Sequence, residues 1–248
     1  MKIGIIGVGH IGKTLALKLA KAGHEVIVAN SSGPENIDAS VFATGATAAT
    51  SAQAVQDREV IILSIPLNRI PDIAPLFTDV PEETTVIDTS NYYPARDSKI
   101  DRIEAGEVES LWVTEQLGRP VAKAWNAIGS HSLIVNGKPN GSNDRIAIPI
   151  ATDRNIDQAV TEALVNDTGF DSFHTGSLAD SWRQQPGAPA YCTDLTLKEL
   201  EVVINTAERE RLPKRRDLAV AAIMERMSSP TANPDAAYGL RISRALYL

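Results

Sequence analysis

Three glycines in the spacing Gly7-x-Gly9-x-x-Gly12 are the residues of this chain whose spacing most directly implies chemistry. An apolar run over residues 2–6 leads straight into them, and a helical run rich in leucine follows. In such a segment the first glycine allows a tight turn, the second lets a pyrophosphate approach the backbone, and the third lets the helix pack on the strand. Free N–H groups at the start of the helix favour phosphate. The spacing therefore predicts a dinucleotide site.

His10 stands between the second and third glycines. Its position implies that it meets the phosphate through its backbone N–H, and we assign no catalytic role to its ring. No set of His, Cys, Asp and Glu residues has the spacing of metal ligands, and no nucleophile-elbow pattern is present. We therefore predict a site without a metal, and we name no catalytic residue from the sequence.

The residues after the second predicted strand indicate which nucleotide is bound. Residues 25–29 read as a strand, and Asn30, Ser31 and Ser32 follow it. NAD-type sites place Asp or Glu here to bind the ribose hydroxyls, whereas this chain has no carboxylate here to repel a 2′-phosphate. Three short polar side chains can donate hydrogen bonds to that phosphate, although the Arg that usually supplies a charge-assisted bond is missing. The pattern favours NADP(H).

Further candidates follow later strands, because ligands of an open α/β sheet bind beyond the carboxyl ends of its strands. Ser64, Ile65 and Pro66 end one strand, and Ile65 is placed to cover a nicotinamide face. Ordinary strand termination is the alternative interpretation. Ser90 and Asn91 end the next strand and suit the orientation of a carboxamide. An Asn turn followed by packed tyrosines explains these residues equally well.

Four residues are candidate contacts for a substrate: Tyr92, Asn126, Trp182 and Arg183. The first two stand at strand ends, and each also has a structural interpretation. The last two belong to an unusual loop over residues 176–191, and long loops in compact domains are commonly functional. An Arg beside a Trp suits an anionic or planar substrate, but the same pair suits anchoring of the tail at a dimer contact.

The order of the predicted elements indicates the fold class. Strands are expected at residues 2–6, 25–29, 46–50, 59–65, 84–88, 120–125, 145–151 and 170–175, and helices at residues 51–56, 69–77, 110–117, 155–166, 195–211 and 218–227. Strands that alternate with helices indicate an α/β fold with a Rossmann-like, doubly wound and mostly parallel sheet. We predict a nucleotide-binding domain over residues 1–178 and a small helical C-terminal extension over residues 179–248, packed on that domain or on a dimer partner.

Composition excludes several classes of partner. The chain has 248 residues and a net charge of −7, without a Lys and Arg run of the kind that binds nucleic acid. Its single cysteine, Cys192, excludes an internal disulfide and fits a reducing compartment. No apolar run reaches membrane-spanning length, and the N-terminus begins at once with a core strand. We expect a cytoplasmic protein that acts on a small molecule, and from the tail a homodimer.

Five stretches together resemble the deazaflavin-dependent NADP oxidoreductase family (coenzyme F-420:NADP oxidoreductase-like proteins). They are residues 5–12, 22–26, 30–35, 64–66 and 171–177, and the resemblance covers most of residues 1–180. It implies that Val8, Gly9, His10 and Ile11 wrap the pyrophosphate, and that Asn30 and Ser31 face the adenosine 2′-phosphate. Members commonly carry an Arg beside this serine, where the present chain has Ser32.

The resemblance implies an oxidoreductase that moves hydride between NADPH and a deazaflavin or flavin-like ring. Two stacked rings need little acid–base machinery, which agrees with the scarcity of such groups here. A reductase of an imine or a β-hydroxy acid is the first alternative, and it needs a proton donor such as Lys or Tyr. Lys123 is expected to point into the sheet, whereas Tyr92 or Tyr93 could serve. The second alternative is a non-catalytic NADP(H)-binding sensor.

Overall fold

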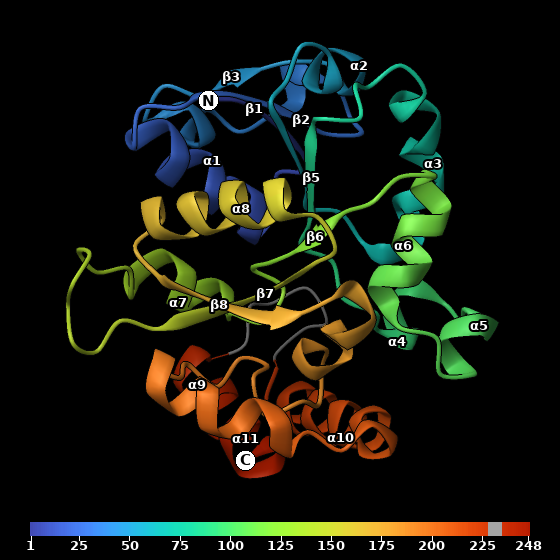
Figure 1. The fold of residues 1–248 in the computed structure, drawn as a ribbon, viewed down its shortest axis with the longest axis vertical. Coiled ribbons are helices and arrows are strands. Elements are labelled where there is room, and N and C mark those ends of the chain that lie inside the picture. The colour runs from blue at the N-terminus through green and yellow to red at the C-terminus, as the bar shows by residue number, and fades with distance from the viewer. Residues whose placement is uncertain (228–234) are drawn as a thin grey trace.

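A computed structural model describes residues 1–227 and 235–248 (Figure 1). Its centre is an eight-stranded sheet in the order β3-β2-β1-β4-β5-β6-β7-β8. The strands are β1 Lys2–Ile6, β2 Glu25–Ala29, β3 Thr47–Ala48, β4 Val60–Leu63, β5 Thr85–Asp88, β6 Ala122–Lys123, β7 Ala147–Thr152 and β8 Asp171–Gly176. All neighbouring strands run parallel except β6 and β7, which pair antiparallel. The predicted Rossmann-like, mostly parallel sheet is confirmed.

Helices cover both faces of the sheet. The α-helices are α1 His10–Lys21, α2 Ser51–Val55, α3 Ile70–Ile73, α4 Pro94–Asp97, α5 Asp101–Glu104, α6 Glu109–Leu117, α7 Ser130–Val135, α8 Asn155–Asp167, α9 Leu197–Val203, α10 Leu212–Glu225 and α11 Ala236–Tyr247. One core cluster joins the sheet to α1, α7 and α8, and another joins it to α2, α3 and α6. In β4 successive residues alternate between these two clusters, as a strand buried on both faces requires.

Prolines explain one wrong prediction about the helices. The single helix predicted over residues 69–77 is three short pieces, Leu67–Arg69, α3 and Ala74–Phe77. Pro71 and Pro75 each lack the N–H that a continuous helix needs, so each starts a new short turn. The helix predicted from Ser51 does begin there, but Thr50 is its cap, through a reciprocal hydrogen-bond pattern with Gln53.

The C-terminal region differs most from the sequence expectations. The predicted helix over residues 195–211 is broken into α9 and the 3₁₀ turns Ile204–Thr206 and Arg209–Arg211. The helix predicted over residues 218–227 begins earlier, at Leu212, and ends at Glu225. Helices α4, α5, α7 and α11 were not predicted. The strand predicted over residues 120–125 shortens to β6 because Trp125 has a φ of 54°, which no extended strand contains.

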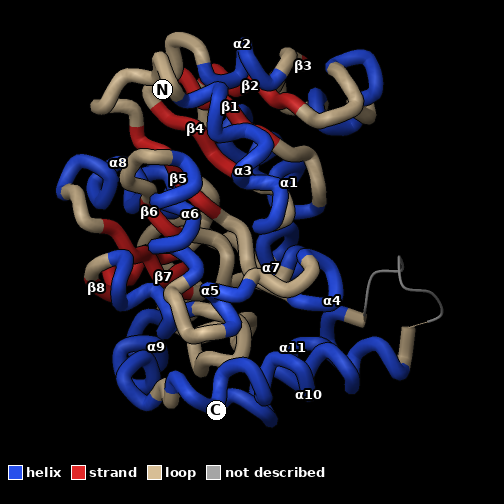
Figure 2. Tube along the Cα trace, turned by 90° about the vertical axis from the view of Figure 1, so that its right-hand side faces the viewer, coloured by secondary structure: helices blue, strands red, loops and turns tan. Residues whose placement is uncertain are grey.

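The C-terminal helices pack back on the same chain, at the end of the molecule opposite β3 (Figure 1). Leu200 and Ile204 pack on Ala147 of β7. Ala219 of α10 and Tyr247 of α11 pack on Tyr191. Figure 2 shows α10 and α11 side by side below the sheet. In the described part of the chain, no helix is long and apolar enough to cross a membrane.

Candidate active site

The turn from β1 into α1 is built around the three predicted glycines. Gly7 has a φ of +101°, and a Cβ there would lie 2.1 Å from the carbonyl oxygen of Ser64. A Cβ at Gly12 would lie 2.0 Å from the carbonyl oxygen of Gly7. Both glycines are therefore required by packing within the protein. A Cβ at Gly9 would meet nothing within 4 Å, so this glycine faces open space.

The beginning of α1 is open to an anion. Gly9 is its N-cap, no side chain accepts a hydrogen bond from the first turn, and that turn has no acidic residue. The first N–H groups of an α-helix have no partner within the helix and favour a negative charge, so this turn can bind an anion. Val8 and Ile11 pack at the edge of the core, where they fix this turn. These features fit a dinucleotide pyrophosphate, which His10 and its neighbours would hold through backbone N–H groups.

The loop after β2 offers polar groups without partners in the protein. Asn30 Oδ1 is buried and has no hydrogen-bond partner, whereas Ser31 and Ser32 are exposed. A buried unpartnered oxygen at a predicted ribose position fits a ligand hydroxyl. Lys13 reaches the following segment, where its ammonium contacts Ser40 and Asp38. The predicted adenosine side therefore contains one basic side chain, which is already paired with a carboxylate.

The next two strand ends lie beside this turn. Ser64 donates its N–H to Ile6 O at 2.8 Å, Ile65 packs partly against the core, and Pro66 is exposed. Ser90 Oγ is a second buried oxygen without a hydrogen-bond partner. Asn91 forms a pair with a residue that follows β6, since its Nδ2 lies 2.9 Å from Asn126 O. These strand ends remain predicted cofactor contacts.

Asn126 is held within a buried network of amides. Its Nδ2 donates to Asn91 Oδ1 at 3.0 Å and to Gln184 O at 2.8 Å, and its Oδ1 accepts from Gln184 Nε2 at 2.9 Å. The side chain is 2% exposed. Its hydrogen bonds therefore position the strand ends, and its contact with a substrate stays a prediction.

Tyr92 and Tyr93 point in different directions. Tyr92 is 1% exposed, its ring packs in the core on the α6 side, and its hydroxyl donates to Oε1 of the exposed Glu104 at 2.8 Å. Tyr93 instead lines a cavity of about 730 Å³ and places its hydroxyl 2.7 Å from that of Tyr191. The neighbouring Tyr93 lines this cavity, whereas Tyr92 lines a smaller cavity of about 150 Å³ beside Glu109 and Arg216. The substrate contact predicted for Tyr92 stays a prediction.

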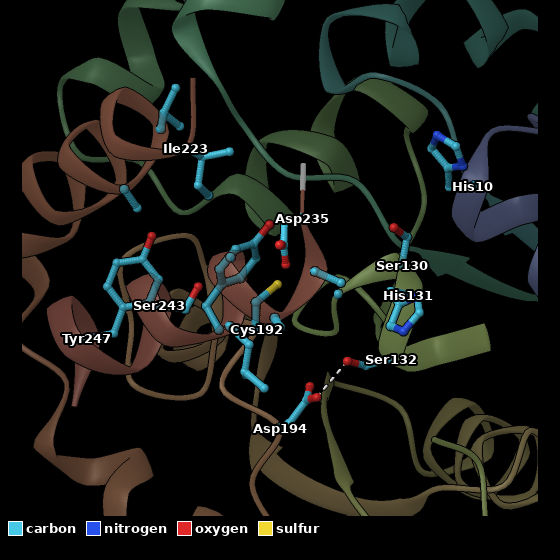
Figure 3. A pocket seen from close by; sticks show the side chains of 18 of the residues that line it. His10, Ser130, His131, Ser132, Cys192, Asp194, Ile223, Asp235, Ser243 and Tyr247 are labelled. Atoms are coloured by element: carbon cyan, nitrogen blue, oxygen red, sulfur yellow. Dashed lines mark hydrogen bonds between the residues drawn. The ribbon is translucent and has the colours of Figure 1, made fainter. Parts of the chain in front are cut away.

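A cavity of about 730 Å³ connects the glycine turn with the C-terminal helices (Figure 3). His10 lies at one end of it, and Tyr247 of α11 lies at the other. Its polar wall includes Ser130, His131, Ser132 and Asp194, and its apolar wall includes Ala219, Val220 and Ile223 of α10 with Leu240 of α11. Its size and mixed lining are typical of a small-molecule site.

Asp194 organises the polar wall. It accepts a hydrogen bond from Ser132 Oγ at 2.6 Å, and Arg244 donates to the backbone oxygens of Thr193 and Asp194. Burial raises the pKa of the Asp194 carboxyl, and the Ser132 hydrogen bond opposes that shift. Nearby, burial raises the pKa of the Cys192 thiol to about 12, so it is an uncharged wall residue and not a thiolate.

Trp182 and Arg183 lie outside the cavity. Both belong to the 3₁₀ helix Leu178–Gln184, which packs against α6. The Arg183 guanidinium lies 4.5 Å from the Trp182 ring centroid and pairs with Asp180 at 2.5 Å, and Arg209 covers the same ring at 5.8 Å. These contacts join the loop to neighbouring elements. Their roles in substrate binding or at a dimer contact stay predictions.

A buried charged network supports the strand ends. Lys123 is fully buried, and its Nζ donates to Asp88 Oδ2 and to Ser90 O, each at 2.6 Å. As expected, Lys123 points into the sheet surroundings and not into the cavity. Glu109 accepts from Tyr92 N at 3.1 Å, and burial raises the pKa of its carboxyl to about 7, opposed by the charge of Lys123. Among the described residues, no cluster of His, Cys, Asp and Glu is arranged to hold a metal ion.

The C-terminal helices supply a cavity wall that was not predicted from the sequence. In α11, Leu240, Ser243 and Tyr247 recur at intervals of three and four, so they share one face, and that face lines the cavity. This spacing was a readable signal for a helix. Nothing in the sequence indicated that Tyr191 would meet Tyr93.

Comparison with known proteins identifies the nucleotide-binding part. The family described as "NADP oxidoreductase coenzyme F420-dependent" matches residues 2–92. The Escherichia coli protein YjhV is 52% identical over 59 residues, which are 24% of this chain and 43% of that protein. The match thus spans less than half the length of this curated relative.

Solved structures resemble a larger part of the chain. Protein SMa0349 from Sinorhizobium meliloti has a TM-score of 0.68 and 28% identity, over 79% of this chain and 95% of that chain. A protein from Arthrobacter described as an F420-dependent NADP reductase has a TM-score of 0.56 and 16% identity, and the match covers 73% of this chain and 87% of that chain. Glycerol-3-phosphate dehydrogenase from Saccharomyces cerevisiae has a TM-score of 0.56 and 16% identity, over 99% and 77%.

At 16% identity the last two likenesses show the fold alone. The resemblance inferred from the glycine turn and the strand ends is confirmed where the family itself matches. The match to the family described as "NADP oxidoreductase coenzyme F420-dependent" covers residues 2–92, which include the glycine turn and the first strand ends.

Proposed function

We propose that this protein is an NADPH-dependent oxidoreductase whose acceptor binds in the cavity between the glycine turn and helices α10 and α11. One observation carries this proposal: the cavity that reaches α11 begins at His10, in the turn that fits a pyrophosphate. A ligand in the cavity therefore lies next to the cofactor site. The family match over residues 2–92 supports the same class of reaction.

The cofactor would be held by groups from three strand ends. Gly9 and the N–H groups of α1 bind the pyrophosphate, Asn30 and Ser31 bind the adenosine ribose and its phosphate, and Ser90 with Asn91 orients the nicotinamide. The unpartnered oxygens Asn30 Oδ1 and Ser90 Oγ support this placement. When bound, NADPH supplies a hydride. The protein orients the acceptor, and α10 and α11 exclude water from it.

A deazaflavin or flavin-like ring is the acceptor that we favour. The description of the matching family supports a deazaflavin, and the apolar side chains of α10 and α11 suit the face of a flat ring. A carbonyl or imine acceptor is the second candidate, because Tyr93 brings a phenol into the cavity. Such a reductase needs a positioned proton donor, and the cavity contains one.

Steady-state oxidation of NADPH tests the proposal with a deazaflavin, FMN, ferric ion and ethyl pyruvate as acceptors. We expect turnover with the ring acceptors and thermal stabilisation of the protein by NADPH, since binding to the folded state raises its melting temperature. Tight NADPH binding without turnover of any acceptor would favour the sensor and contradict the enzyme. Turnover of ethyl pyruvate alone would favour the carbonyl reductase.

A further inference from the structure

Two tyrosine hydroxyls meet at the wall of the cavity. Tyr93 follows β5 and Tyr191 precedes α9, yet their hydroxyl oxygens lie 2.7 Å apart, and both residues line the cavity that begins at His10. Each phenol carries one proton. Their mutual hydrogen bond uses one of the two protons, and the other remains for a third group.

Tyr93 is held in place by contacts with Arg96 and Asp97, which follow it in the sequence. Its backbone N–H donates to Asp97 Oδ2 at 2.9 Å, and the Arg96 guanidinium lies 5.5 Å from its ring centroid. Arg96 in turn donates to both oxygens of Asp97 at 2.8 Å. A bidentate ion pair beneath the ring limits the orientations that Tyr93 can adopt.

Tyr191 is fixed by the C-terminal helices. Its ring centroid lies 6.4 Å from that of Tyr247 at an interplanar angle of 60°, and Ala219 belongs to the same buried cluster. Its backbone N–H donates to Ala188 O at 2.9 Å. Both phenols are thus held before any ligand arrives, which is the condition for a preorganised donor.

The two hydroxyls keep their protons at neutral pH. Burial raises the pKa of Tyr93 and of Tyr191 above the ordinary value of 10. A neutral phenol donates a hydrogen bond to an oxygen, whereas a phenolate cannot. The Tyr92 hydroxyl, in contrast, lies away from this cavity, where it donates to Glu104 and accepts from Ile100 N at 3.1 Å.

We propose that Tyr93 and Tyr191 together donate a hydrogen bond to a carbonyl oxygen of the acceptor in the cavity. This inference rests on the proposed function and adds the chemistry by which the acceptor is recognised. The oxygen becomes more negative when the acceptor is reduced, so the hydrogen bond strengthens during the reaction and accelerates it. Ring carbonyls of a flavin or deazaflavin and the carbonyl of an open-chain ketone share this chemistry.

Single hydroxyl deletions test the inference. Tyr93→Phe and Tyr191→Phe keep each ring and its packing but remove one oxygen. Tyr238→Phe is the matched control, because Tyr238 lies on α11 outside the cavity and donates to Ala222 O at 3.3 Å. For each variant we would measure the melting temperature, the Kd of NADPH, the Kd of FMN, of a deazaflavin and of ethyl pyruvate, and kcat with each acceptor.

We expect each cavity variant to lower kcat by about 100-fold and to raise the Kd of the acceptor by roughly five- to tenfold. In both cavity variants the Kd of NADPH should stay within about twofold of the wild-type value. Tyr238→Phe should change neither kcat nor the Kd of the acceptor by more than about twofold. The probe whose Kd and kcat change in the cavity variants identifies the acceptor as a ring or as a ketone. Equal acceptor Kd and kcat in wild type and both cavity variants would overturn the inference.

The binding measurements separate this inference from the proposed function. Wild-type protein that does not bind NADPH would overturn the proposed function, while the acceptor Kd values would still decide the role of the tyrosines. Wild-type protein that binds none of the three carbonyl probes would overturn the inference. Equal losses in Tyr238→Phe would also overturn it, because they would show a general effect of helix α11.

Discussion

Replacing Gly9 by Ala separates cofactor binding from folding. A Cβ at Gly9 meets no atom within 4 Å, and the residue has a φ of −65° and a ψ of −173°, which any residue adopts. Alanine is a poorer N-cap than glycine, by about 0.5–1 kcal/mol, but it lowers the backbone entropy of the unfolded chain by a similar amount. The free energy of unfolding should therefore change by less than about 1 kcal/mol.

The same methyl group lies in the path of a pyrophosphate. If it prevents one charge-assisted hydrogen bond to an N–H group of α1, the loss is roughly 1.5–3 kcal/mol. That corresponds to a 10- to 100-fold rise in the Kd of NADPH, at about 1.4 kcal/mol for each tenfold change. Nicotinamide fluorescence measures the Kd, and calorimetry measures the melting temperature, which should shift by no more than about 4 °C.

Gly12→Ala serves as the control, because it should lower the stability of the fold, whereas Gly9→Ala should lower only the affinity for NADPH. Its Cβ would lie 2.0 Å from Gly7 O, and backbone cannot rotate away as a side chain can. Helix α1 must move from the sheet, at a cost of about 1–3 kcal/mol or more, so the melting temperature should fall clearly. Wild-type NADPH affinity in Gly9→Ala, or a large loss of stability in it, would refute the reasoning about this turn.

Three further predictions concern selectivity, the buried ion pair and pH. Ser31→Asp should raise the Kd of NADPH relative to the Kd of NADH by about tenfold or more, because a carboxylate repels the 2′-phosphate. An unchanged ratio of the two Kd values would contradict the assignment of this loop. Asp88→Asn should destabilise the protein by about 3–5 kcal/mol in urea unfolding, since it removes the carboxylate that is hydrogen-bonded to the buried Lys123 ammonium, and the double variant with Lys123→Met should lose less than the sum of the two single variants. Glu109 has a pKa of about 7 in the folded protein against an ordinary value of 4.5, so the folded state binds the proton more tightly and stability falls as pH rises from about 4.5 to 7. Glu109→Gln should remove that part of the slope, and an identical slope in wild type and variant would show that another group titrates.

Local patterns were sufficient for the nucleotide-binding half of the fold. Residues 2–29 combine a glycine turn with strand and helix periodicity, and each signal concerns residues that are close in sequence. The apolar run before Pro66 predicted a strand, and β4 is a strand whose residues are all buried. The wrong helix over residues 69–77 was avoidable, because Pro71 and Pro75 are visible in the sequence.

The cavity could not be predicted in the same way. Its tyrosine pair joins Tyr93 to Tyr191 across 98 positions of the sequence, and no periodic pattern encodes such a contact. Trp125 and Cys192, which lie next to Asn126 and Tyr191 in the sequence, have a positive φ. Only tertiary packing can impose this backbone conformation on residues of these types. Local spacing therefore suffices to predict a cofactor site, while the proposed acceptor site depends on how distant segments dock.

The two outer strands of the sheet bear on how copies of this chain can associate. Strand β3 has only two residues, so it offers too few free backbone groups to recruit another strand. At the other edge, the pairing of β7 with β8 is interrupted by an irregularity at Ile150 and Ala151, and irregular edges resist extension by a neighbour. Continuation of the sheet from one molecule into the next is thus disfavoured at both ends, which protects the protein from edge-to-edge aggregation and leaves helical surfaces for self-association.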